Sequence, residues 1–151
     1  MSINNQPLPL HDMSRILAID YGKKRTGIAV SDPLQIIANG LTTVATHELT
    51  QFLKNYLSKE TIECFVIGLP IQMNGEASEN QSRVRQFAKQ LEKIFPTIPI
   101  VFYDERFTSK IAHQTMIDGG LHKKQRMNKA LVDEISATII LQSYMESKRL
   151  F

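Results

Sequence analysis

The feature that most constrains the fold is a series of short, continuous apolar runs, each closed by a turn or by a helical stretch. Residues 16–20 and 26–31 are two such runs, and the glycine- and lysine-containing segment 22–25 between them predicts a β-hairpin. Residues 35–44 can supply a third strand, with Gly40 at a bulge or bend. Runs of this length are too short for typical helices, so the chain must build a sheet.

Stretches with helical spacing of apolar residues separate and follow the later strands. Two further strands are expected at 64–69 and 98–103. Thr46 is placed to cap a helix over 47–58, and Ser78 has capping-box spacing to Gln81 at the start of the next helix. A short helix from Thr108 to Gly119-Gly120 and an apolar helix over 129–146 complete the chain. The order predicts an α/β three-layer sandwich, with helices on both faces of a mixed five-stranded sheet.

The length and composition are those of one domain in a reducing compartment. The chain has 151 residues, and at that size about 70% of the unfolded surface can be buried, so 14–151 is expected to be a single domain. Residues 1–13 are rich in amide and proline and are expected to form a flexible tail. Neither a signal sequence nor a long apolar span is visible, and the single cysteine, Cys64, lies in a predicted strand. We therefore expect a cytoplasmic protein.

Carboxylates stand where apolar elements end or begin. Asp20 closes the first strand on the same face as Ile16 and Ala18, although it could simply accept hydrogen bonds from the following turn. Asp104-Glu105 follows the fifth strand, where a helix dipole is an alternative explanation. Asp133-Glu134 lies near the start of the last helix, and the helical wheel does not choose between the two acids.

Acids at two strand ends and on one apolar helix could converge at one edge of the sandwich. Their mutual repulsion would require a cation, and ligands that are all oxygen favour Mg²⁺ or Mn²⁺. The four histidines and single cysteine show no zinc-type spacing. Such a cluster suits phosphodiester hydrolysis, in which metal ions activate water and stabilise the departing oxygen.

Basic residues lie near the predicted acidic cluster in two places. Lys23, Lys24 and Arg25 occupy the first hairpin turn, and the spacing of Gly22 and Gly27 is not that of a phosphate-binding Walker motif, because no Gly-Lys-Ser/Thr follows. Arg25 is the strongest candidate, since a guanidinium can bind phosphate with two hydrogen bonds or brace the acids. The lysines could equally form a solvated hairpin tip.

A second basic run joins the last two predicted helices. It could close over a nucleic-acid backbone or could be only a soluble connection. Near the start of the helix after Ser78, side chains of Asn80, Arg83 and Arg85 could also contact substrate. The members of the basic run expected to bind nucleic acid are Lys123, Lys124, Arg126 and Lys129.

Four segments in order resemble one known family. They are 18–27 (AIDYGKKRTG), 68–70 (GLP) with Asn74-Gly75, 103–108 (YDERFT), and Val132-Asp133 leading to 140–144 (ILQSY). Together they are similar to the YqgF (RuvX-like) family, whose members are described as pre-16S ribosomal RNA nucleases and formerly as candidate Holliday junction resolvases. The match runs from about Arg15 to Glu146.

The resemblance implies an RNase H-like fold and a set of catalytic, metal-binding acids at Asp20, Glu105 and Asp133. It makes Asp104 and Glu134 neighbours of the site rather than ligands, and adds Arg106 as a nucleic-acid contact. The implied activity is a metal-dependent nuclease, a hydrolase acting on ester bonds. The implied substrate is structured RNA, with processing of the 5′ end of pre-16S rRNA in ribosome biogenesis as the role.

Three other functions remain open at the level of sequence. A Holliday junction resolvase in DNA recombination or repair would use the same chemistry and require a symmetric homodimer rather than a monomer. A non-catalytic nucleic-acid-binding protein could retain the fold, although three acids count against it. An actin-like phosphotransferase is suggested by Asp20-Tyr21-Gly22, but the chain is too short for two lobes around ATP.

Overall fold

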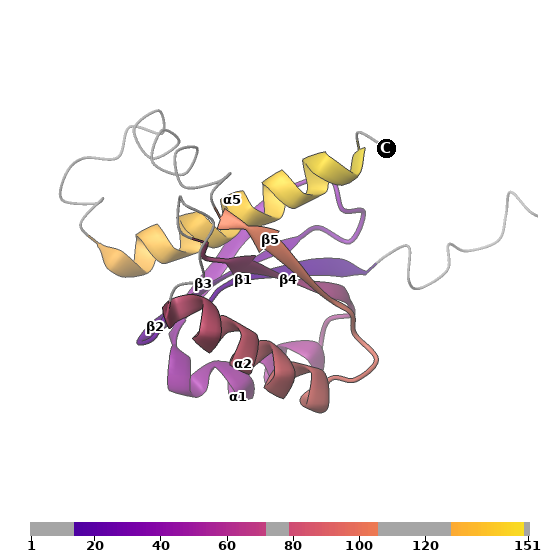
Figure 1. The fold of residues 1–151 in the computed structure, drawn as a ribbon. Helices are drawn as coiled ribbons and strands as arrows, with labels where there is room; N and C mark the ends of the chain where they lie inside the picture. Colours follow the sequence, from indigo (N-terminus) through magenta and orange to yellow (C-terminus); the bar gives the residue numbers. More distant parts are fainter. Residues whose placement is uncertain (1–13, 72–78, 106–127, 150–151) are drawn as a thin grey trace, which may run out of the picture.

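The computed structural model describes residues 14–71, 79–105 and 128–149. These residues form one five-stranded sheet and the helices that cover it (Figure 1). The sheet has the strand order β3-β2-β1-β4-β5. In chain order the elements are β1 (Arg15–Asp20), β2 (Arg25–Ser31), β3 (Ala38–Ala45), the 3₁₀ turn η3 (Thr46–Glu48), α1 (Leu49–Leu57), β4 (Ile62–Leu69), α2 (Glu79–Ile94), β5 (Ile100–Asp104) and α5 (Lys129–Arg149).

The sheet is mixed, as the sequence predicts. Strands β1, β2 and β3 pair antiparallel, and β1, β4 and β5 pair parallel. The register between β2 and β3 shifts where Ala29 pairs with Gly40 rather than with Leu41, which confirms an irregularity next to Gly40. The carboxyl ends of β1, β4 and β5 consequently meet at one edge of the sheet, where ligands bind in open α/β sheets.

Alternation along the strands divides the core into two layers. Residues such as Leu17, Ile19 and Phe65 pack under α1 and α2, whereas Ile16, Ala18 and Val66 pack under α5. Figure 1 shows α1 and α2 on one side of the sheet and α5 on the other. The prediction of three layers with helices on both faces is confirmed.

Two local predictions at element boundaries are wrong for identifiable reasons. Thr46 does not cap α1; its hydroxyl donates to the carbonyl of Gly22 at 2.7 Å, and η3 precedes the helix. The third strand begins at Ala38 rather than at residue 35, because Asp32 Oδ1 accepts the backbone N–H groups of Ile36 and Ile37, each at 2.7 Å. In both places a side chain that bonds to a distant or local backbone group overrides the propensity.

The last helix begins where the sequence predicts it. Asn128 caps α5 through its side-chain oxygen, which accepts from the N–H groups of Ala130 and Leu131. Within the described ranges no helix is long and apolar enough to cross a membrane. The predicted tail 1–13 and the predicted short helix that begins at Thr108 lie outside the described residues.

Candidate active site

Asp20 ends β1 between two glycines on the neighbouring strands. It pairs with Gly27 of β2, and Gly68 of β4 follows Ile67, the partner of Ile19. By strand alternation these three residues face α5. Because both neighbours of Asp20 on this face are glycines, no side chain flanks it there. This leaves room for groups from elsewhere in the chain.

Gly27 allows the start of α5 to approach the sheet. A Cβ on Gly27 would overlap the carbonyl oxygen of Asp133, and it would lie 3.0 Å from the backbone nitrogen of Glu134. The hydroxyl of Thr43 on β3 also donates to the carbonyl of Ala130 at 2.6 Å. The close backbone contact and this hydrogen bond hold the first turns of α5 over β2 and β3.

Gly68 makes the corresponding space for Glu105. A Cβ there would stand 2.5 Å from Glu105 Oε1 and 2.7 Å from Ile140 Cδ1. Glu105 directly follows β5, which pairs parallel with β4 through Gly68 and Tyr103. The carboxylate of Glu105 thus lies back over β4, toward Asp20.

Asp20 and Glu105 meet in the structure. Their carboxyl groups are close enough for a hydrogen bond between them. The pKa of Asp20 is raised well above the ordinary aspartate value, first by burial, then by the charge of Glu105 and the hydrogen bond to it, and finally by the charge of Asp133. Burial also raises the pKa of Glu105, the hydrogen bond to Asp20 opposes that rise, and the charge of neighbouring Asp104 adds to it. The charged forms of both acids are therefore disfavoured where they meet.

Asp133 reaches this site electrostatically and is held by an arginine. Its charge acts on Asp20, while Arg25 Nε donates to Asp133 Oδ2 at 3.2 Å. Burial raises the pKa of Asp133, and the hydrogen bond and charge of Arg25 oppose that rise. Among the described residues, no group of three His, Cys, Asp or Glu side chains is close enough to form a ready-made metal cluster. Arg25 thus braces the third acid beside the Asp20–Glu105 pair.

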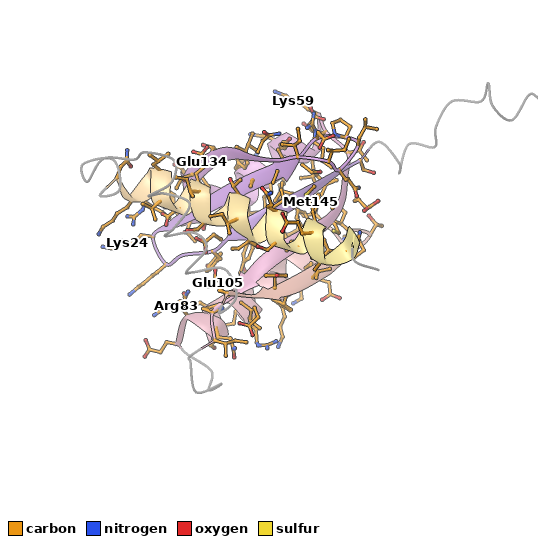
Figure 2. All side chains as sticks on the ribbon, turned by 90° about the horizontal axis from the view of Figure 1, so that it is seen from above. Lys24, Lys59, Arg83, Glu105, Glu134 and Met145 are labelled. Carbon is orange, nitrogen blue, oxygen red and sulfur yellow. The ribbon has the colours of Figure 1, made fainter. Side chains whose placement is uncertain are left out.

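Glu134 takes a different direction from Asp133. Its Oε1 would lie 2.6 Å from a Cβ on Gly40 of β3, at the far side of β2 from Asp20. Figure 2 shows Glu134 and Glu105 on opposite sides of α5. Glu134 therefore lies at the contact between α5 and β3, whereas Asp133 bonds to Arg25.

The basic residues that the structure describes surround this edge but do not close it. Lys23 and Lys24 are exposed in the β1–β2 turn, and Lys129 is exposed at the start of α5. Figure 2 shows Lys24 and Arg83 toward the same end of the molecule as Glu105. The expected contacts at Arg106, Lys123, Lys124 and Arg126 lie outside the described residues.

Sequence reasoning missed a threonine pair that holds the first turn. The hydroxyls of Thr26 and Thr46 are hydrogen-bonded at 2.9 Å, and the N–H of Thr46 donates to the carbonyl of Lys24 at 2.9 Å. With the bond from Thr46 to Gly22, these contacts join the segment after Asp20 to the end of β3. The sequence shows only a threonine at each of these positions. Thr26 is then interpreted as an ordinary strand residue and Thr46 as a helix cap.

Comparison with known proteins decides the family. The model of the RuvX family, described as Holliday junction resolvase, matches residues 14–147. The chain belongs to the RuvX family. A relative from Bacteroides thetaiotaomicron named "Putative pre-16S rRNA nuclease" is 66% identical over 91% of this chain and 99% of its own. A relative of the same name from Flavobacterium johnsoniae is 60% identical, with the same coverage of both chains.

Solved structures agree on the fold of this RuvX member. T. thermophilus RuvC in complex with a Holliday junction substrate matches with a TM-score of 0.55 and 12% identity, over 89% of this chain and 97% of that one. The yeast mitochondrial Holliday junction resolvase matches with a TM-score of 0.54 and 13% identity, over 93% and 81%. The predicted RNase H-like fold is confirmed.

Proposed function

We propose that this chain is a metal-dependent nuclease that hydrolyses phosphodiester bonds in precursor 16S rRNA, processing its 5′ end in the cytoplasm. The observation that carries the proposal is the adjacent pair of carboxyl groups Asp20 and Glu105, half-buried at the edge where the carboxyl ends of β1, β4 and β5 meet. The names of relatives at 60% and 66% identity supply the substrate.

The chemistry of the donor set suits a divalent cation. Asp20 and Glu105 already lie side by side, and Asp133, whose charge acts on Asp20, would move closer to join them. Oxygen ligands of this kind suit Mg²⁺ or Mn²⁺. Asp20 and Glu105 would hold the cation as carboxylates, with Asp133 completing the ligand set. When bound, the ion supplies the positive charge that activates water and stabilises the departing oxygen.

The other residues of the site would position the substrate backbone. Arg25 has a guanidinium that can exchange its single bond to Asp133 for a paired contact with a phosphate. Lys23, Lys24 and Lys129 are exposed around the same edge and would neutralise neighbouring phosphates. Further contacts with the substrate are proposed from the sequence alone. The family resemblance supports Arg106, and the basic run before the last helix supports Lys123, Lys124 and Arg126.

The test compares the parent protein with Asp20→Asn, Glu105→Gln and Asp133→Asn on precursor rRNA, in Mg²⁺, Mn²⁺ or EDTA. We expect cleavage by the parent in Mg²⁺ or Mn²⁺ and none in EDTA. Changing a side chain that hydrogen-bonds to a metal ligand typically lowers metal affinity or activity about 10–100-fold. Losing a ligand itself should therefore lower the cleavage rate more than about 100-fold. Glu134→Gln is the matched control because Glu134 faces β3. An Asp20→Asn protein as fast as the parent would refute the proposal.

A junction substrate belongs in the same experiment. The family model carries the description Holliday junction resolvase, so synthetic four-way DNA junctions should be compared with the rRNA precursor at equal concentration. Symmetrical paired cuts in the junction by a protein that is dimeric in solution would favour the resolvase. Cleavage of the precursor alone would favour the RNA substrate.

A further inference from the structure

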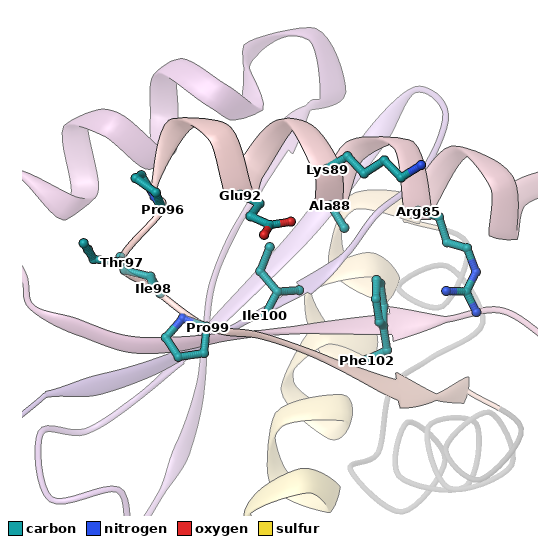
Figure 3. A pocket seen from close by; sticks show the side chains of 10 residues that line it. All are labelled: Arg85, Ala88, Lys89, Glu92, Pro96, Thr97, Ile98, Pro99, Ile100 and Phe102. Carbon is teal, nitrogen blue, oxygen red and sulfur yellow. The ribbon is translucent and has the colours of Figure 1, made fainter.

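An open groove lies between α2 and the edge strand β5, on the opposite face of the sheet from α5. Its volume is about 470 Å³, within the size range of small-ligand pockets. Figure 3 shows the side chains that line it, with Ile100 and Phe102 of β5 directed toward α2. The lining residues are Arg85, Ala88, Lys89, Glu92, Pro96, Thr97, Ile98, Pro99, Ile100 and Phe102.

One end of this groove combines an aromatic ring with positive charge. Phe102 is 37% exposed although it is a large apolar side chain, and the Arg85 guanidinium carbon stands 5.3 Å from the centre of its ring. Lys89 lies one helical turn after Arg85, so two exposed cations line the same wall. A phosphate can bind between them.

The far end of the groove has different chemistry. Glu92 lines it above Ile100, and Pro96 and Pro99 form its apolar border (Figure 3). A carboxylate disfavours phosphate there, but it can accept hydrogen bonds from base amino groups or from a ribose 2′-hydroxyl. The groove thus offers cations at one end and an apolar wall with a hydrogen-bond acceptor at the other.

The cationic end is also the end nearest the acidic pair. Phe102 and Glu105 are three residues apart, which is about 10 Å of extended chain. A nucleic-acid strand rises about 3.4 Å per nucleotide, so about three stacked nucleotides span that distance. Because the acids face α5 and the groove faces α2, a strand leaving the acidic site would pass around the edge strand β5 and reach Phe102 and Arg85 first.

We propose that this groove binds an unpaired nucleotide of the RNA substrate, a few positions from the bond that is cut. The base packs on Phe102 and Ile100, and Arg85 and Lys89 hold the adjacent phosphates. Stacking on an aromatic ring between cations is the usual way in which proteins hold single-stranded nucleic acid. The inference rests on the proposed function, since it names which part of the RNA the protein contacts away from the acids.

The test measures binding without cleavage. Fluorescence anisotropy in EDTA would compare a blunt RNA stem with the same stem carrying a single-stranded overhang of a few nucleotides, and with a DNA overhang of the same sequence. Phe102→Leu keeps an apolar side chain and removes the ring, and Phe102→Tyr restores the ring. Lys89→Ala is matched by Lys93→Ala, one turn further along α2 and outside the groove.

We expect Phe102→Leu to weaken binding of the RNA overhang about tenfold and Phe102→Tyr to restore it, with the blunt stem unaffected. Lys89→Ala should lower the salt dependence of overhang binding by about one phosphate contact, whereas Lys93→Ala should not. Equal binding of overhang and blunt RNA by the parent, or tight Phe102-dependent binding of the DNA overhang alone, would overturn the proposal.

The same measurement separates this inference from the proposed function. Suppose that binding of the overhang depends on the Phe102 ring, but the protein does not cut precursor rRNA in Mg²⁺. That result would support nucleotide binding in the groove and refute the proposed nuclease activity. Cleavage of precursor rRNA with overhang binding unchanged in Phe102→Leu would do the reverse. Circular dichroism of each variant establishes that the comparison is between folded proteins.

Discussion

The two faces of the sheet are packed differently around the ends of the strands. Under α1 and α2 the strands present large side chains, among them Leu17, Ile19 and Phe65, all fully buried. Under α5 the strands present Ala18 and Ala29 beside Ile16 and Val66 in the core, and glycines at the edge. Away from the groove beside β5, the first face is a core that only stabilises. The second lets a helix approach closely enough to bring a charged residue beside Asp20.

The difference teaches where this fold can place chemistry. Buried charge is costly, so carboxylates gather where the packing is thin and a partner or a cation can reach them. Gly27 and Gly68 make that thin region on the α5 face, and Asp20, Glu105 and Asp133 occupy it. We therefore expect substitutions in the core under α1 to change stability alone, and substitutions under α5 to change activity as well.

The largest effect on stability is expected from Leu53→Ala on the α1 face. Leu53 is fully buried, and truncating a buried leucine costs about 2–5 kcal/mol. Urea denaturation would measure the free energy of unfolding, and cleavage per folded molecule should stay at the parental rate. Ile140→Ala is the matched variant on the α5 face, where activity should fall too because Ile140 Cδ1 borders Gly68. Equal loss of activity in both variants would contradict the division between faces.

Gly27→Ala should have a smaller cost in stability and a large one in activity. The new Cβ would overlap the Asp133 carbonyl, so α5 must shift away from β2. Overpacking of this kind costs about 1–3 kcal/mol, while a displacement of 1 Å at an active site can cost about 100-fold in rate. Denaturation and single-turnover cleavage measure the two effects. A stable variant with full activity would show that the close approach of α5 is not needed.

The third prediction concerns pH without metal. The raised pKa of Asp20 means that the folded protein holds a proton more tightly than the unfolded chain. The resulting stabilisation is present below the ordinary aspartate pKa and is lost as pH rises through the raised value, by at most about 1.4 kcal/mol per pH unit for one group.

Thermal unfolding in EDTA across that pH range should show the loss, and Mg²⁺ should restore stability at the upper end. In Asp20→Asn the carboxyl that carries most of this effect is absent, so its dependence on pH should be flatter. A parent protein whose stability in EDTA rises with pH over the same range would contradict the assignment.

The smallest effect on stability is expected from Arg25→Ala. Its bond to Asp133 is 3.2 Å long and partly exposed, and such pairs contribute about 0–1 kcal/mol. Arg15 makes a 3.2 Å bond of the same kind to Glu60 at the other end of the sheet, so Arg15→Ala is the matched control. Both should change unfolding little, and only Arg25→Ala should slow cleavage. Equal cleavage by the two variants would remove Arg25 from the site.

Much of this fold could be predicted from local patterns. The apolar runs locate the five strands and the helical spacing locates α1, α2 and α5, because burial requires those periods. The errors fall at boundaries such as Thr46 and residues 35–37, where side chains bond to backbone groups that the local pattern does not reveal. The mixed sheet with helices on both faces likewise follows from the antiparallel first strands and the βαβ connections after them.

The site could be predicted only in part from the sequence. The residues by themselves indicate acids at Asp20, at 104–105 and at 133–134, and the family resemblance implies Glu105 and Asp133 within the two pairs. The direction of Glu134 toward β3, the bond from Arg25 to Asp133 and the contact between Asp20 and Glu105 depend on segments that are distant in the chain meeting in space. Chain connectivity does not encode those distances.

The sequence by itself determined which elements form and that a carboxylate ends the first strand, because hydrophobic period and chain order are local properties. Only the tertiary structure decided what that carboxylate meets. The sequence does not show that Gly27 and Gly68 leave space for other groups, because the role of a missing side chain depends on what occupies its place in the fold. In this fold α5 and Glu105 fill those places, and Asp20 lies between them.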